Sequence, residues 1–116
     1  MKISHITIQT RHFDAEIAFY EKYTGMTVQQ DMRPMGRNMV FLADNKDATQ
    51  IEIIENLESE DIATPHLSIG FHTADIDALH RELSEAGFEV TPFVTPMPQV
   101  RFFFVKDPAG MNIQFM

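Results

Sequence analysis

Apolar and polar residues alternate in several short stretches of the chain, and this pattern predicts β-strands. In residues 3–9, for example, Ile6 and Ile8 fall on one side and polar side chains on the other. Further strands are predicted at residues 26–32, 38–43, 49–55, 66–71, 88–91, 100–105 and 111–115. The alternation is typical of sheets that have one buried face and one more polar face.

Two other segments carry apolar residues at the three- and four-residue spacing of a helix, and they cover residues 15–24 and 75–86. Asp14 and Asp75 precede or open these segments, where an aspartate can cap the first amide groups. A glycine follows each segment, in the position that favours a left-handed helix end. We therefore expect two capped helices, each inserted between strands.

The second half of the chain repeats these signals in the order of the first half. The matching pairs, all at nearly the same separation along the chain, are His5 and His66, Asp14 and Asp75, and Gly25 and Gly87. Each half has the order β-α-β-β-β, and the whole chain is predicted to be an α+β fold of two tandem βαβββ modules related by pseudo-two-fold symmetry. We expect one domain over residues 1–116, with modules at about 1–55 and 66–116 and an acidic linker at about 56–65.

Composition narrows the possible partners and compartment of the protein. The formal net charge is −8 without any basic stripe, which argues against binding to nucleic acid. The chain has no cysteine, which excludes disulfides and thiolate chemistry. No run of about 18 apolar residues is present, so no membrane partner is expected. These features lead us to expect a cytoplasmic protein that binds a small molecule.

The repeat also brings together candidate metal ligands. Glu52 and Gln114 occupy corresponding places in their halves, at the separation that the other matching pairs show. If the halves are related by a two-fold axis, His5, Glu52, His66 and Gln114 would take equivalent positions on the polar faces of four strands. Two imidazoles, a carboxylate and an amide oxygen are a plausible site for one divalent metal ion. Taken singly, each of these residues is more often a structural or surface residue than a ligand.

The motifs HITI, FY, GM and IEI in the first half, and HLSI, DID, GF and DPAGMNIQF in the second, resemble the vicinal oxygen chelate (VOC) superfamily. This is the glyoxalase, bleomycin resistance protein and dioxygenase group. The resemblance implies curved sheets around a cavity, with a metal at the positions of His5, Glu52, His66 and Gln114. Nickel, cobalt or zinc suit these ligand types best. The ligand pattern is closest to that of glyoxalase I, which typically has a carboxylate in place of Gln114.

From this resemblance we expect a metal-dependent lyase or isomerase that transfers a proton next to a metal-polarised carbonyl. Glu52 would be the catalytic base, because Gln114 cannot accept the proton. Methylmalonyl-CoA epimerase has a similar ligand set with the glutamine and glutamate interchanged. The alternatives are a non-catalytic, bleomycin-resistance-like protein that binds a small molecule or drug, and a domain that keeps its ligands by descent and senses a small molecule.

Four residues are expected to contact the substrate. Gln9 and Asn56 lie where glyoxalase I binds glutathione, and the asparagine matches that family whereas Gln9 replaces an arginine. Arg101 and Phe103 share one side of a predicted strand and could line the pocket, although the run of three phenylalanines is also typical of a strand core. His80 is expected at the surface of the second helix. Relatives of this size resemble domain-exchanged homodimers, and we expect a homodimer.

Overall fold

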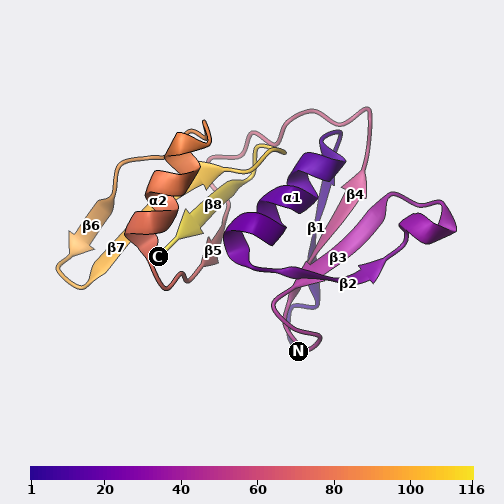
Figure 1. Ribbon diagram of the computed structural model, residues 1–116, viewed down its shortest axis with the longest axis horizontal. Helices are drawn as coiled ribbons and strands as arrows, with labels where there is room; N and C mark the ends of the chain where they lie inside the picture. Colours follow the sequence, from indigo (N-terminus) through magenta and orange to yellow (C-terminus); the bar gives the residue numbers. More distant parts are fainter. The chain divides into compact units, whose positions relative to one another are not determined.

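Two successive β-α-β-β-β units form the chain in the computed structural model, which describes residues 1–116 (Figure 1). The first unit, residues 1–61, contains β1 (His5–Thr10), α1 (Phe13–Thr24), β2 (Thr27–Asp31), the 3₁₀ turn η1 (Arg33–Met35), β3 (Met39–Ala43) and β4 (Gln50–Glu55). The second unit, residues 62–116, contains β5 (Ser68–Phe71), α2 (Ile76–Glu85), β6 (Val94–Met97), β7 (Val100–Lys106) and β8 (Asn112–Phe115). The predicted α+β fold with tandem βαβββ modules is confirmed.

Both units have the same sheet topology. The strand orders are β1-β4-β3-β2 and β5-β8-β7-β6. In each sheet the first and last strands of the unit pair in parallel and the remaining neighbours pair antiparallel. The first two strands of each unit run in the same direction at opposite edges of the sheet, so the chain between them must cross the sheet, and the helix forms this crossover on one face.

Each sheet therefore has one face under its own helix and one face turned away from it. In the first unit the covered face holds buried Ile8, Ile51 and Ile53, against which α1 packs (Figure 1). In the second unit Phe103 and Phe115 are buried on the covered face. We call the opposite side of each sheet its open face. Strand alternation places three of the predicted ligands, His5, Glu52 and Gln114, on the open faces.

The two helices begin differently, and one predicted cap was wrong. Asp75 caps α2, since its carboxylate accepts a hydrogen bond of 3.0 Å from the Ala78 amide. Helix α1 begins earlier than predicted, at Phe13, so that His12 takes the N-cap position and Asp14 lies in the first turn. Asp14 still favours the helix there through the macrodipole, without a capping hydrogen bond. The residue equivalent to Asp75 is therefore His12, not Asp14.

The strand predicted at residues 88–91 was also wrong. Only Val90 makes a bridge there, to Val105, and β6 forms instead in the proline-rich segment that was expected to be a loop. Pro96 is tolerated because β6 is an edge strand whose pairing with β7 is irregular between Val94 and Met97. The side chain of Thr91 replaces part of the missing ladder by accepting a hydrogen bond from the Phe104 amide (2.9 Å).

The predicted linker at residues 56–65 is divided between the two units: residues 56–61 belong to the first and residues 62–65 to the second. Asp61 is held in the first unit by Arg11 at 3.3 Å, whereas the amide of Ile62 donates to the carbonyl of Ala109 in the second (2.7 Å). The change from one unit to the other thus falls at a single peptide bond.

Neither helix is long and apolar enough to cross a membrane.

The different helix starts lead to a test of stability. Replacing Asp75 by alanine removes a capping acceptor and should lower the free energy of unfolding by about 1 kcal/mol. Asp14→Ala removes only a favourable charge near the first turn and should cost about 0.3 kcal/mol. Urea unfolding of both variants measures the difference; equal losses would contradict the observed positions of the caps.

Candidate functional site

The open face of the first sheet has a polar centre made by His5, Thr7 and Glu52. The ladder pairs Thr7 with Glu52, and the threonine hydroxyl donates a hydrogen bond of 2.5 Å to Glu52 Oε1. His5 lies diagonally across, with its Nε2 3.7 Å from the same oxygen. The Glu52 side chain is 13% exposed and that of His5 43%. An acidic group is therefore held in a fixed direction, with an imidazole beside it.

Apolar side chains and a second polar pair surround this centre. Phe41 is the ladder partner of Glu52 on its other side and stands edge-on to the His5 ring, with centroids 5.8 Å apart. Asn56 Nδ2 donates a hydrogen bond of 2.8 Å to Gln9 Oε1. The structure thus brings together Gln9 and Asn56, the two residues predicted from the sequence to contact the substrate. Their role in substrate binding stays a prediction.

The open face of the second sheet is neutral and aromatic at the corresponding place. Gln114 lies between Gly70 and Phe104 in the ladder, and a Cβ on Gly70 would lie 3.8 Å from Gln114 Oε1. Phe102 and Phe104 project on this same face, with ring centroids 5.7 Å apart. Gln114 therefore offers an amide beside an aromatic wall.

His66 does not occupy the position that corresponds to His5. It lies in the turn before β5, whereas the prediction placed it at the start of that strand. His5 precedes the ladder partner of Glu52 by two residues; the residue that precedes the partner of Gln114 by two is Ser68. His66 lies two residues further back, about 6.6 Å along an extended strand. Ser68, which sequence reasoning overlooked, is thus the structural equivalent of His5.

Arg101 and Phe103 lie on the covered face, and this argues against the expected substrate contacts. Phe103 is fully buried and pairs with Phe115. Arg101 reaches Asp77 on α2, with its Nη2 2.7 Å from Asp77 Oδ2, and stacks over the Phe93 ring. The alternation of β7 places Phe102 and Phe104 on the open face in their stead.

His80 is also more enclosed than predicted. Its ring stacks on Phe93, with centroids 4.5 Å apart, and meets the edge of Phe103 at 4.8 Å. His80 Nε2 lies 2.9 Å from the Thr91 carbonyl oxygen. His80 therefore links α2 to the segment before β6 through these contacts, whereas the sequence predicted a surface residue.

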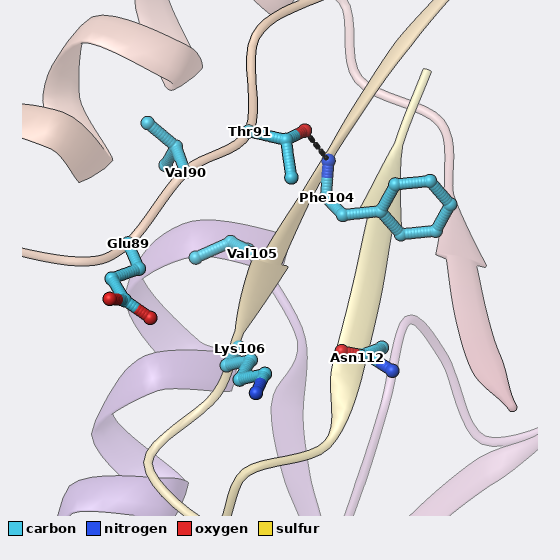
Figure 2. Close-up of a pocket in the computed structure, with 7 residues that line it drawn as sticks. All are labelled: Glu89, Val90, Thr91, Phe104, Val105, Lys106 and Asn112. Carbon is cyan, nitrogen blue, oxygen red and sulfur yellow. Dashed lines mark hydrogen bonds between the residues drawn. The ribbon is translucent and has the colours of Figure 1, made fainter. Parts of the chain in front are cut away.

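A groove crosses the open face of the second sheet (Figure 2). Its larger part, about 390 Å³, is bounded by the chain before β5, including His66, and by Phe104. The part drawn in Figure 2 is about 150 Å³ and is lined by Glu89, Val90, Thr91, Phe104, Val105, Lys106 and Asn112. Asn112 Nδ2 donates to the Thr64 carbonyl at 2.9 Å, and this bond fixes one wall. The registers of the β5–β8 and β7–β8 pairs bring Phe104 and Asn112 to this groove, and the sequence pattern alone did not reveal these registers.

The donor set within each unit does not fit a catalytic metal ion. Such a site needs about three protein ligands. The first unit supplies one imidazole and one carboxylate, while the corresponding positions of the second unit supply a hydroxyl and an amide, which are weak ligands for nickel, cobalt or zinc. Within neither unit do three histidine, aspartate or glutamate side chains come together.

The position of Arg101 gives a pH-dependent prediction. Its hydrogen bond holds the pKa of Asp77 below the ordinary value, with added help from the charges of Arg101, Arg81 and His80. The stabilising contribution of this ion pair is therefore present above pH 4 and is lost as the pH falls through the lowered pKa.

In Arg101→Gln, the pKa of Asp77 should rise towards its ordinary value while binding of ligands to the open face is unchanged. Carboxyl carbon shifts recorded by NMR between about pH 2 and pH 6 measure the first effect. An unchanged Asp77 titration would show that the ion pair does not persist in solution.

Comparisons with known proteins agree with this architecture. An uncharacterised protein of Pseudomonas aeruginosa is 29% identical over 121 residues, covering 97% of this chain and 86% of that protein. A possible glyoxalase from Bacillus cereus is 26% identical, with a TM-score of 0.77 and coverage of 100% and 98% of the two chains. TnmS3, an antibiotic-binding protein from a Streptomyces species, shares the fold at 18% identity, with a TM-score of 0.72 and coverage of 99% and 93%. Because residues 2–115 match its family pattern, the chain belongs to the Glyoxalase/Bleomycin resistance protein/Dioxygenase superfamily.

Proposed function

We propose that this protein binds a small organic molecule in the groove on the open face of its second sheet, without a metal ion. The observation that carries the proposal is the pairing register of β5 and β8, which puts Ser68 rather than a histidine at the position equivalent to His5. At these positions the second unit is thereby left with a hydroxyl and an amide, which are weak metal ligands, while the aromatic wall and the groove remain.

The chemistry of the groove suits a ligand with a flat apolar part. Phe104 lines the groove and can pack against such a ligand, while Thr91 and Asn112 present polar groups at the border. TnmS3, which shares the fold, is described as an antibiotic-binding protein. That likeness supports a binding role for the fold without identifying the ligand of this chain.

A ligand titration followed by NMR tests the proposal. Isotope-labelled protein treated with a chelator should bind at least some aromatic molecules of a small screening set, and the amide shifts should concentrate on β5, β7 and β8. Phe104→Ser should weaken binding about tenfold or more, because it removes an aromatic contact surface. Phe41→Ser, on the open face of the first sheet, is the matched control. Shifts confined to the helices would contradict the proposed site.

The second candidate is a metal-dependent lyase or isomerase, as the sequence suggested. What favours it is the ordered pair of His5 and Glu52, whose carboxylate is fixed by Thr7. His5, Glu52, His66 and Gln114 would hold the ion, which when bound would polarise a substrate carbonyl. Glu52 would then accept the proton from the neighbouring carbon.

Elemental analysis separates the two candidates. The binding proposal predicts far less than one divalent ion per chain after incubation with nickel, cobalt or zinc and dialysis. About one ion per chain, lost in His66→Ala, would support the lyase instead, and Glu52→Gln should then abolish turnover on any substrate found.

We also propose that the chain forms a homodimer, since each sheet leaves an open face with apolar side chains such as Phe102, Phe104 and Ile54 that its own unit does not cover. Light scattering at micromolar concentration that gives the mass of a monomer would refute this.

A further inference from the structure

Lys106 is the one charged residue that the four strands of the second sheet present on its open face. The ladder sets Lys106 opposite Asn112 and Asn112 opposite Ser68, in the row next to Phe104, Gln114 and Gly70. Phe102 continues the same face of β7, and β6 carries no charged residue. Among the strand residues of this face, Lys106 is therefore the single charged group, and it stands at the end of the row.

The ammonium group of Lys106 is not neutralised by the protein. It is exposed, and no carboxylate lies within ion-pair distance of it, in contrast to Arg11, Arg33 and Arg101, which are all in ion pairs. It lines the groove together with Phe104 and Asn112 (Figure 2). It also borders an adjoining hollow of about 190 Å³ beside residues 62–65.

The two uncharged polar side chains at this end of the groove, Asn112 and Thr91, already make hydrogen bonds within the protein. Asn112 donates to the carbonyls of Thr64 and Leu67, at 2.9 and 3.4 Å. The Thr91 hydroxyl accepts from the Phe104 amide. A ligand that reaches this end consequently meets Lys106 as the available charged donor, with the Phe104 side chain in the same groove.

We propose that Lys106 selects small organic anions, specifically carboxylates with an attached aromatic or apolar group, as ligands of this groove. The inference rests on the proposed binding function and names the class of ligand. An ammonium group pairs with a carboxylate by a charge-assisted hydrogen bond, and Phe104 packs against the apolar part. Because the chain carries a net charge of −8, its general field repels anions, so a bound anion depends on this local cation.

Glu89 lines the same part of the groove and opposes this selection. The bridge between Val90 and Val105 places Glu89 beside Lys106 on the neighbouring segment, outside ion-pair distance. Its carboxylate lowers the attraction for an anion and would favour a cation instead. Removing the Glu89 charge should thus strengthen anion binding, whereas removing the Lys106 charge should weaken it.

The probe is phenylacetate, with phenylacetamide as a neutral molecule of nearly the same shape. Both are titrated by NMR into chelator-treated wild-type protein, Lys106→Met, Lys106→Arg and Glu89→Gln. Phenylacetate should bind about fivefold more weakly to Lys106→Met, the loss expected for a partly exposed ion pair. Lys106→Arg should restore binding, and Glu89→Gln should tighten it about twofold. Phenylacetamide should bind all four proteins alike.

The outcomes separate this inference from the proposed function. If both probes shift the same β5, β7 and β8 amides with equal affinity in wild type and Lys106→Met, the groove stands and the role of Lys106 is wrong. If neither probe shifts those amides while other aromatic molecules of the screening set do, the groove stands and the selection by Lys106 is refuted. If no molecule of that set shifts them, the groove is refuted as well. A loss of phenylacetate binding in Lys106→Met that Lys106→Arg does not rescue would point to altered folding and also overturn the inference.

Discussion

The pairing register of the two parallel strand pairs is the constraint on which the rest of the structure depends. It sets Thr7 opposite Glu52 in the first sheet and Gly70 opposite Gln114 in the second. A slip by one residue would turn every buried side chain of a strand to the open face, so burial of the core under each helix keeps the register fixed. The same register decides which side chains can meet a ligand.

One topology thereby carries two different chemistries. The first sheet holds a carboxylate between a hydroxyl, which donates a hydrogen bond to it, and an imidazole, whose Nε2 lies 3.7 Å from the same oxygen. The second sheet offers an amide, an aromatic wall and one cation at the equivalent side. Because Gly70 has no side chain, Gln114 lies over bare backbone there, while the equivalent Glu52 is held by Thr7. The repeat has kept the scaffold and changed the groups it presents.

Most of the fold could be predicted from the sequence, because alternation and helical spacing reflect burial directly. The sequence also predicted that His5 and His66 take equivalent positions in the two sheets, and this prediction was wrong for the same reason as the predicted cap at Asp14. Both predictions assumed the separation that joins His5 to His66 and Asp14 to Asp75. The real caps, His12 and Asp75, and the real strand positions, His5 and Ser68, share a slightly wider separation.

The residue types explain why the sequence concealed this wider separation. His12 lacks a capping side chain, so no residue type signalled the true helix start. Ser68 does not match His5 in kind, so only the pairing register could show that the two are equivalent. Lys106 was missed because its role depends on which face of β7 is open.

The most direct test of this account is calorimetric titration of nickel into wild-type protein and Ser68→His. If Ser68 occupies the position equivalent to His5, an imidazole there should strengthen nickel binding by about tenfold or more, since nickel prefers imidazole to a hydroxyl, and it should do so also when His66 is replaced by alanine. Wild-type protein should bind the ion only weakly. Tight binding of one ion per chain to wild type, unaffected by Ser68→His, would contradict the register argument and restore His66 as the ligand.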